Sequence, residues 1–332
     1  MRAMILERQR EPLRLADIPV PVPSPTQVRL RVRACGLCRT DLHVVEGDLR
    51  NPKLPLVPGH QIVGTVDCVG SDVTGFANGE RVGVPWLGGA CGECRFCRNG
   101  QENLCDRARY TGYDIDGGLA EFCVADARFC FHLAQLLDDT AVAPLLCAGL
   151  IGYRALRMVG DARQIGFYGF GSSAHLLVQV ARSEGRTVYA FTRAGDRAGQ
   201  AFALQLGAVW AGASGEPPPV DLDGAVIFAP IGDLVPLALR AVRKGGTVVC
   251  AGIHMSDIPS FPYSALWGER VLRSVANLTR RDGQEFLAIA HAIAIQPKTT
   301  IYPLEETNQA LDDMRAGRLH GAAVVARFEM TQ

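Results

Sequence analysis

The chain has 332 residues, of which 48% are hydrophobic and 20% charged, and its 34 basic side chains balance its 34 acidic ones. This composition predicts a globular protein of about two domains with enough apolar material for a core. A net charge of zero excludes a general electrostatic attraction for nucleic acid or an acidic membrane surface, so we expect neither as a partner.

The cellular compartment follows from the N-terminus and the cysteines. The opening stretch, MRAMILERQR, carries charges where a secretion signal needs an unbroken apolar run, and no later run reaches the length of a membrane span. We therefore expect a cytoplasmic protein. Because the cytosol keeps thiols reduced, its 11 cysteines point to metal binding or catalysis more than to disulfides.

The first part of the chain, up to residue 135, is expected to be rich in β-structure with irregular loops. Short β-branched runs alternate there with turn-forming residues: QVRLRVRAC (27–35), IVGTVDCVG (62–70), ERVGVPW (80–86) and EFCVA (121–125). Two of the connecting segments contain residues that bind metals in other proteins. These are Cys38 in CGLCRTDLH and His60 in VPGHQIVG.

Four cysteines lie close together in ACGECRFCRNGQENLC (90–105), with the spacing C-x2-C-x2-C-x7-C. Such a loop can surround one zinc ion with four thiolates and leave no coordination position open, as in a structural site. An iron–sulfur cluster and a nucleic-acid-binding zinc ribbon also use four cysteines. The flanks are not a basic sheet, which argues against the ribbon, and the rest of the chain offers a hydride carrier, which argues against the cluster. We therefore expect structural zinc bound by Cys91, Cys94, Cys97 and Cys105.

From about residue 150 the pattern changes to alternating strands and helices. The apolar runs at 164–170, 187–193, 223–230 and 245–253 alternate with helical patterns such as SAHLLVQVARSEG (173–185). This alternation predicts a parallel sheet covered by helices on both faces. After residue 279 we expect a helix in GQEFLAIAHAIA (283–294), the segment 301–318, and a final strand in GAAVVARFE (321–329).

The turn after the first strand of this sheet is a candidate dinucleotide site. The sequence YGFGSSAH places glycines after a strand and opens a helix, so backbone N–H groups can face a pyrophosphate. The alternative is an ordinary tight turn of an α/β protein. The candidate cofactor-binding residues of this turn are Gly169, Phe170, Gly171, Ser172, Ser173 and Ala174.

The adenosine ribose is expected to lie at the end of the second strand. Many NAD-binding proteins have an acidic residue there, whereas this chain has Thr192 and Arg193. An arginine can pair with a 2′-phosphate, which favours NADP over NAD. Arg193 as a solvated strand-end residue is the alternative.

A third thiol, Cys147 in LLCAGLIGY, completes a scattered ligand set with Cys38 and His60. Two thiolates and one imidazole are typical of a catalytic zinc that keeps a fourth position open. Each residue alone has another explanation: a buried small side chain for Cys147, a core histidine for His60, and a C-x-x-C redox pair for Cys38 with Cys35.

Taken in order, these motifs resemble the zinc-dependent alcohol dehydrogenases of the medium-chain dehydrogenase/reductase family. The resemblance extends over essentially the whole chain: CGLCRTDLH, the Gly-His pair, the four-cysteine loop, LLCAG and the dinucleotide turn all occur in the family's order. It implies an α/β protein with a GroES-like β-rich catalytic domain (1–149 and 279–332) and a Rossmann domain with a doubly wound parallel sheet (150–278). The active site would lie in the cleft between them, in a homodimer or homotetramer.

The resemblance also implies the roles of individual residues. Cys38, His60 and Cys147 match catalytic zinc ligands, and Cys91, Cys94, Cys97 and Cys105 match structural ones, giving two zinc ions per chain. Zinc would lower the pKa of the alcohol before hydride transfer to the nicotinamide. The other matches are Thr40 (alcohol proton), His43 (proton transfer to solvent), Asp41 (orienting His60) and Arg39 (pyrophosphate). Trp86 is a candidate wall of the substrate pocket, or simply a packed aromatic residue.

Two positions depart from the family pattern. Gln61 stands where the family has Glu after the ligand histidine, so a mechanism in which that carboxylate approaches the metal is in doubt. Ile151 stands where the family often has a Thr that contacts the nicotinamide, which removes a hydrogen bond.

Three functions could make use of these residues. The first is a dehydrogenase of a small primary alcohol, or a reductase of its aldehyde. The second is a related polyol or sugar dehydrogenase, for which we find no clear carboxylate to bind sugar hydroxyls. The third is a zinc- and dinucleotide-binding redox sensor without turnover, which has no use for a proton relay. The first function is therefore expected.

Overall fold

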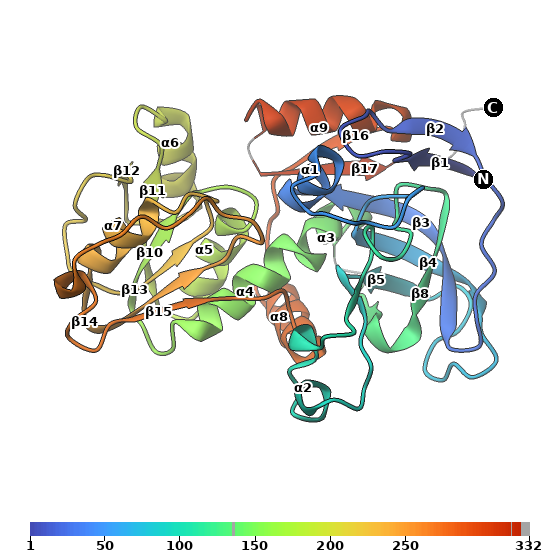
Figure 1. Ribbon diagram of the computed structural model, residues 1–332, viewed down its shortest axis with the longest axis horizontal. Coiled ribbons are helices and arrows are strands. Elements are labelled where there is room, and N and C mark those ends of the chain that lie inside the picture. The colour runs from blue at the N-terminus through green and yellow to red at the C-terminus, as the bar shows by residue number, and fades with distance from the viewer. Residues whose placement is uncertain (135–136, 320, 327–332) are drawn as a thin grey trace. The chain divides into compact units, whose positions relative to one another are not determined.

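The structure is a computed structural model that describes residues 1–134, 137–319 and 321–326. Its contacts divide the chain into two compact units (Figure 1). The first unit combines Met1–Ala148 with Leu278–Gln332, and the second is Gly149–Asn277. Two stretches that lie far apart in the sequence therefore build the first unit together.

The first unit is built mainly on a seven-stranded sheet in the order β16-β17-β3-β4-β5-β9, with β8 also pairing with β3. Its longest strand is β3, which buries Val28, Leu30 and Val32 on one face because side chains alternate along a strand. Smaller pairs join β1 to β2 and β6 to β7. The strands of this unit are β1 (Arg2–Ile5), β2 (Arg14–Asp17), β3 (Gln27–Leu37), β4 (Gln61–Val69), β5 (Arg81–Val84), β6 (Leu87–Gly89), β7 (Arg109–Tyr110), β8 (Phe122–Asp126), β9 (Phe131–His132), β16 (Thr299–Tyr302) and β17 (Ala322–Ala326).

Strand β17 holds the C-terminal stretch in this sheet. It pairs antiparallel with β3, so that Ala323 lies opposite Leu37 and Ala326 opposite Ala34. The helices and 3-10 turns of the unit are α1 (Arg39–Glu46), α2 (Arg95–Arg98), η1 (Glu102–Leu104), η2 (Ala127–Phe129), α3 (Asp139–Val142), η3 (Ala143–Leu146), α8 (Arg280–Ala292), η5 (Leu304–Glu306) and α9 (Thr307–Arg315).

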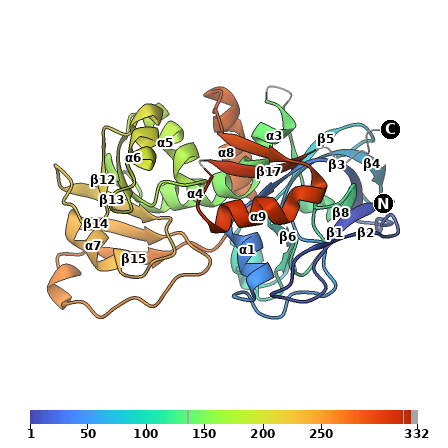
Figure 2. The same cartoon turned by 90° about the horizontal axis from the view of Figure 1, so that it is seen from above.

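The second unit is a six-stranded parallel sheet in the order β12-β11-β10-β13-β14-β15. Helices α5 and α6 lie on one side of it (Figure 2). From β10 the chain first moves outward through β11 to β12, and from β13 it moves the opposite way. Right-handed crossovers therefore place α7 on the other face. The elements are α4 (Ala148–Met158), β10 (Gln164–Tyr168), α5 (Ala174–Ser183), β11 (Thr187–Thr192), α6 (Arg197–Leu206), β12 (Trp210–Ala213), β13 (Leu222–Ile227), α7 (Leu234–Ala241), β14 (Val242–Cys250), η4 (Tyr263–Ala265) and β15 (Val271–Ser274).

The expected fold class is confirmed: a β-rich unit accompanies a doubly wound parallel sheet. The order in which the chain adds strands to the sheet reverses between β10 and β13. Open α/β sheets bind ligands at the carboxyl ends of the strands at such a point. The core of the sheet includes Tyr168 and Phe191, whose rings stack with centroids 4.0 Å apart.

Some elements differ from the sequence-based expectations. The sequence patterns did not indicate strands β1, β2, β6, β7, β9, β12, β15 and β16. Helix α8 begins at Arg280, earlier than expected, because Thr279 and Asp282 form a capping box. The predicted last strand begins at Ala322 as β17, and its residues 327–329 lie outside the described residues.

Among the described residues, no single helix has the length and apolar character needed to cross a membrane. One bent pair, Asp139–Leu146 with Ala148–Met158, meets that test by length and composition only.

Candidate functional site

The junction of β3 and α1 positions the first candidate ligand. Cys38 is the N-cap of α1, and its Sγ accepts a hydrogen bond of 3.4 Å from the backbone N–H of Thr40. Asp41 completes a capping box by accepting the Cys38 N–H at 2.8 Å. The start of a helix favours negative charge, so this position suits a thiolate.

The chain brings Cys38, His60 and Cys147 together within the first unit. Their ligand atoms all lie within 4.8 Å of one another. His60 Nε2 is 3.3 Å from Cys38 Sγ, which is 4.0 Å from Cys147 Sγ. His60 directly precedes β4, and Cys147 directly follows the 3-10 turn Ala143–Leu146. Two soft sulfurs and one ring nitrogen form a donor set that fits zinc and leaves one tetrahedral position open.

Asp41 orients the imidazole of this cluster. Its Oδ1 lies 3.1 Å from His60 Nδ1, and both side chains are buried. This contact leaves Nε2 directed at the sulfurs, as in carboxylate–histidine–metal arrangements. One carboxylate therefore caps α1 with Oδ2 and holds His60 with Oδ1.

The protonation of the cluster reflects these contacts. A hydrogen bond from the Cys147 thiol lowers the pKa of Cys38 well below its ordinary value, and the same bond raises the pKa of Cys147. Burial disfavours a charged His60, but the charges of Asp41 and Cys38 prevail and raise its pKa to about 10. A metal ion must displace the protons of His60 and Cys147, so metal binding is expected to weaken at low pH.

We predict that Asp41→Asn weakens metal binding at this cluster. The substitution removes the negative charge from the contact with His60 and disturbs the cap of α1. Partners of this kind typically contribute roughly 10- to 100-fold to metal affinity or activity. Competition with a chromogenic chelator measures the affinity. Asp48→Asn, which changes a carboxylate outside the cluster, should leave the metal affinity unchanged. A metal affinity of Asp41→Asn equal to that of the wild type would contradict the role of Asp41 in orienting His60.

The two residues expected to move a proton both lie on α1. Thr40 and His43 are buried, and His43 Nδ1 is 2.8 Å from Asp48 Oδ2. Asp48 is exposed and follows Gly47, the left-handed C-cap of α1. Sequence analysis did not identify Asp48. The signal was available in retrospect, because Gly47 ends the helix and turns the next residue back toward the last turn.

The other candidates of the first unit occupy different environments. Gln61 is buried over Gly36 of β3, and its Nε2 has no hydrogen-bond partner among the described residues. The Trp86 ring centroid lies 6.2 Å from that of His60. Its buried Nε1 also lacks a partner in the described part of the chain. Arg39 is exposed and forms no ion pair with the described residues.

The four-cysteine loop forms a second cluster of thiols. The ligand atoms of Cys91, Cys94, Cys97 and Cys105 all lie within 4.8 Å of one another. Backbone N–H groups also face the sulfurs: Cys94 N–H donates to Cys91 Sγ at 3.3 Å, and Cys97 N–H donates to Cys94 Sγ at 3.5 Å. Hydrogen bonds from the Glu93 and Cys94 backbone lower the pKa of Cys91 to about 6. This donor set fits a closed tetrahedral zinc site.

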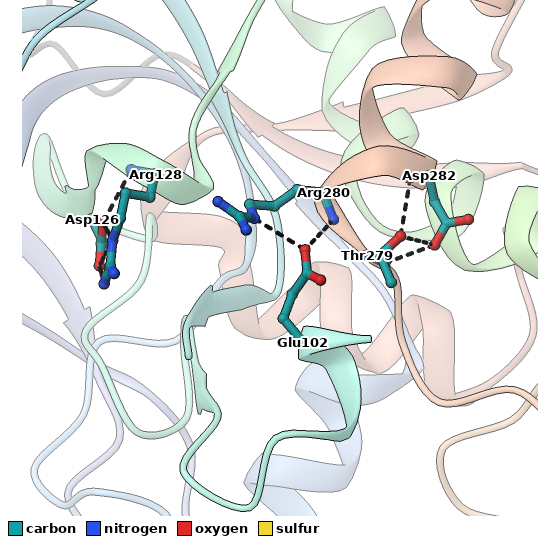
Figure 3. A network of polar contacts seen from close by, with 6 residues as sticks. All are labelled: Glu102, Asp126, Arg128, Thr279, Arg280 and Asp282. Carbon is teal, nitrogen blue, oxygen red and sulfur yellow. Dashed lines mark hydrogen bonds and ion pairs between the residues drawn. The ribbon is translucent and has the colours of Figure 1, made fainter. Parts of the chain in front are cut away.

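A buried carboxylate connects this loop to the start of α8 (Figure 3). Glu102, on η1, accepts hydrogen bonds from the backbone N–H of Arg280 at 2.9 Å and from its Nε at 3.0 Å. The N-terminus of a helix favours a negative charge, so Glu102 adds to the Thr279–Asp282 capping box. The sequence motifs did not reveal Glu102, because its partner lies 178 residues away.

Glu102→Gln is predicted to destabilise the first unit by about 1.5–3 kcal/mol, the usual value of hydrogen bonds to a charged group. Although burial opposes ionisation, the bonds from Arg280 lower the pKa of Glu102 below its ordinary 4.5. The stabilisation is therefore present above pH 4.5 and is lost as the pH falls through the folded-state pKa. Urea unfolding at pH 7 and pH 4 measures this effect. Glu285→Gln, in an exposed pair, is the control. If the difference in the free energy of unfolding between Glu102→Gln and the wild type is as large at pH 4 as at pH 7, the interpretation is contradicted.

In the second unit, the turn after β10 has the features of a phosphate site. Gly169 has φ +90°, and a Cβ there would meet Ala229 at 2.9 Å, so only glycine fits. A Cβ at Gly171 would meet nothing within 4 Å, which leaves the backbone approachable. The buried Ser172 Oγ has no partner among the described residues. Ala174 then begins α5 fully buried.

The two candidate ribose-binding residues differ in whether their polar groups are free to bind a ligand. Thr192 is buried, and its hydroxyl contacts the carbonyl of Arg193 and accepts a bond of 3.2 Å from Gln200 Nε2. Arg193 is exposed and forms no ion pair with any described residue. Its guanidinium is therefore an available charged group at the end of β11. Of the remaining turn residues, Ser173 is the N-cap of α5, and the Phe170 ring meets that of Phe202 on α6 with centroids 6.1 Å apart.

Comparison with known proteins agrees with this geometry. Residues 24–135 match the model of the alcohol dehydrogenase GroES-like domain. A protein of Mycobacterium tuberculosis (strain CDC 1551 / Oshkosh) named probable alcohol dehydrogenase AdhA is 49% identical over 302 residues, covering 89% of this chain and 87% of that protein. An alcohol dehydrogenase of Geobacillus stearothermophilus is 34% identical, covering 98% and 99%. A solved cinnamyl alcohol dehydrogenase of Sorghum bicolor has the same fold, with a TM-score of 0.90, 24% identity and 99% coverage of each chain.

Proposed function

The chain belongs to the zinc-dependent alcohol dehydrogenases of the medium-chain dehydrogenase/reductase family, and we propose that it acts on small primary alcohols and their aldehydes. The observation that carries the proposal is the convergence of Cys38, His60 and Cys147 in one unit, with Asp41 orienting the imidazole. In this proposal Met1–Ala148 and Leu278–Gln332 form the catalytic domain, and Gly149–Asn277 binds the dinucleotide.

The proposal includes two zinc ions per chain with different roles. Cys38, His60 and Cys147 would hold the catalytic ion, because this set leaves one position open. When bound there, zinc supplies a Lewis acid that lowers the pKa of an alcohol or polarises a carbonyl. The four thiolates of the loop 91–105 would hold a structural ion. All 11 cysteines are free in the structure, which supports function in a reducing compartment.

The protein's own residues would carry the alcohol proton away. The Thr40 hydroxyl is the proposed first acceptor, and it lies on the same short helix as His43. His43 would pass the proton on to the solvent side, where Asp48 contacts Nδ1 at 2.8 Å. Because Asp48 is exposed and His43 buried, this pair connects the interior to water. In aldehyde reduction the same groups would return a proton.

The dinucleotide is proposed to bind at the carboxyl end of β10. The open backbone of Gly171 and the unpaired Ser172 hydroxyl support a pyrophosphate there, and Arg39 is the proposed additional cation. Because Thr192 is engaged within the protein, Arg193 carries the preference for NADP over NAD. A higher kcat/KM with NADP than with NAD supports this preference, and the reverse order contradicts it.

Gln61 offers a test of the metal environment. We expect Gln61→Glu to alter the rate or its pH dependence while the metal stays bound, since a carboxyl group replaces an amide of the same shape beside His60. Burial raises the pKa of a carboxyl group, so the effect should grow as the new group ionises with rising pH. pH–rate profiles with metal analysis measure both quantities. Loss of zinc from this variant would refute the expectation.

We also propose a homodimer or homotetramer. The support is the exposed edge strand β15, where Val271 is 44% exposed, and the nearby exposed Tyr263 and Trp267 of the same unit. Edge strands and apolar patches of this kind are typical of interfaces. Analytical ultracentrifugation at several concentrations measures the oligomeric state.

Steady-state kinetics with a panel of substrates tests the function. The panel should contain primary and secondary alcohols, the matching aldehydes, and polyols or sugars. Highest kcat/KM with small primary alcohols or aldehydes supports the proposal. Preference for polyols or sugars favours a related dehydrogenase of those substrates. A zinc-loaded protein that binds the dinucleotide but turns over nothing in the panel favours a redox sensor.

A further inference from the structure

The four-cysteine loop is the connection of a small β-hairpin. Strand β6 ends two residues before Cys91, and β7 begins four residues after Cys105. The two strands pair antiparallel, with Leu87 opposite Tyr110. So short a pair is barely stable alone, and closing its long connection costs entropy. A metal bound by the loop would therefore stabilise the hairpin by holding its connection closed.

The base of this hairpin carries an aromatic stack. Trp86 directly precedes β6, and its ring stacks on that of Tyr110 with centroids 4.3 Å apart and planes at 23°. The Thr111 N–H donates to the Trp86 carbonyl at 2.8 Å, so backbone and ring contacts both join the two ends. Tyr110, which lies just after the cysteine loop, therefore contacts Trp86 directly.

Trp86 also lies next to the candidate catalytic cluster. Its ring is tilted by 59° relative to the His60 ring, with centroids 6.2 Å apart. The indole is buried, and Nε1 has no hydrogen-bond partner within the described residues, so no polar contact there fixes its orientation. Of these two ring contacts, the stack with Tyr110 is the closer one, and stacking of aromatic rings favours a defined relative orientation.

We propose that Tyr110 is a positioning residue for the substrate pocket: it sets the orientation of Trp86 beside His60, and the metal-bound cysteine loop holds Tyr110 in place. The inference rests on the proposed function, in which Trp86 lines the pocket of a catalytic zinc. The loop would then influence substrate binding through the hairpin as well as supporting the fold.

Fluorescence of Trp86 tests this coupling independently of turnover. The chain has three tryptophans, so Trp210→Phe with Trp267→Phe leaves Trp86 as the only one. In this background Tyr110→Leu should shift the emission to longer wavelength and increase quenching by acrylamide. Tyr110→Phe keeps the stacking ring and should restore wild-type behaviour. Tyr113→Leu is the matched control, because the structure shows no ring contact between Tyr113 and Trp86 among its described residues.

Kinetics of the same variants provides the second measurement. Tyr110→Leu should change KM by about two- to tenfold, the usual size of an aromatic contact, with a smaller change in kcat and unchanged zinc content. Cys94→Ser should shift Trp86 emission in the same direction as Tyr110→Leu. If Cys94→Ser fails to fold, the Tyr110 variants still decide whether Tyr110 orients Trp86, and Trp86 emission before and after zinc removal from the wild type tests the part played by the loop.

A folded Tyr110→Leu protein with unchanged emission, quenching and KM overturns the inference, as does a Tyr113→Leu protein with equal effects. If the wild type oxidises no alcohol and reduces no aldehyde, the proposed function fails instead. The fluorescence comparison still reports on the contact in that case.

Discussion

Cys38→Ser is expected to abolish alcohol oxidation while leaving a folded protein that still binds the dinucleotide. A serine hydroxyl is a poor replacement for a thiolate ligand, so the cluster keeps only His60 and Cys147 as zinc ligands. Lewis-acid stabilisation contributes several kcal/mol to such reactions, so kcat should fall at least about a thousandfold. Steady-state rates, zinc analysis and dinucleotide titration measure the three properties.

Cys35→Ser is the matched control for this prediction. Cys35 is a buried thiol three residues before Cys38, and it lies outside the ligand cluster. The same substitution there should therefore retain most of the activity. A Cys38→Ser enzyme as active as Cys35→Ser would show that Cys38 is not a catalytic ligand. An unfolded Cys38→Ser protein would indicate that the cluster of Cys38, His60 and Cys147 has a structural role.

Cys94→Ser is expected to act on stability before activity. The loop 91–105 contains little regular structure beyond α2 and η1, so a metal held by its thiolates would replace the contacts of a core. Loss of one thiolate should lower Tm by roughly 10 °C or more and release one zinc ion per chain. Differential scanning calorimetry and metal analysis measure both effects.

Cys68→Ser is the corresponding control, since Cys68 lies on β4 and belongs to neither ligand cluster. It should leave Tm and zinc content close to wild type. A Cys94→Ser protein with wild-type Tm would contradict a structural role for the loop. If stability is lost in Cys38→Ser and retained in Cys94→Ser, the roles of the two clusters are exchanged.

The parts of the site that sequence could predict are those encoded locally. The spacing of the four cysteines and the glycines after β10 are short patterns whose chemistry follows from neighbouring residues. Cys38, His60 and Cys147 are far apart in the chain, and their residue types suggested one ligand set, which the order of the motifs in the family resemblance then supported. The structure then places their ligand atoms within 4.8 Å of one another.

Contacts between distant segments could not be predicted in this way. Glu102 meets Arg280 across 178 residues, and nothing around either residue specifies the other. Tyr110 lies on a strand of two residues, too short for any periodic pattern. Its stack with Trp86 depends on hairpin pairing around the cysteine loop.

The strands that sequence did not indicate are short, with four residues or fewer. β2 and β15 have four residues each, and their burial does not alternate as in a half-buried strand. Edge strands contact the rest of the sheet on one side only, so selection for an apolar pattern is weak. By contrast, β3 has eleven residues and alternates clearly at its start, which made it recognisable.

Zinc content followed through chelation and reconstitution, with activity measured in parallel, is the most direct test of the account. Active enzyme should contain two zinc ions per chain. Removal of the ion held by Cys38, His60 and Cys147 should abolish turnover, and its return should restore it. Full activity in protein free of transition metal would contradict the central claim that a metal held by Cys38, His60 and Cys147 is needed for the reaction.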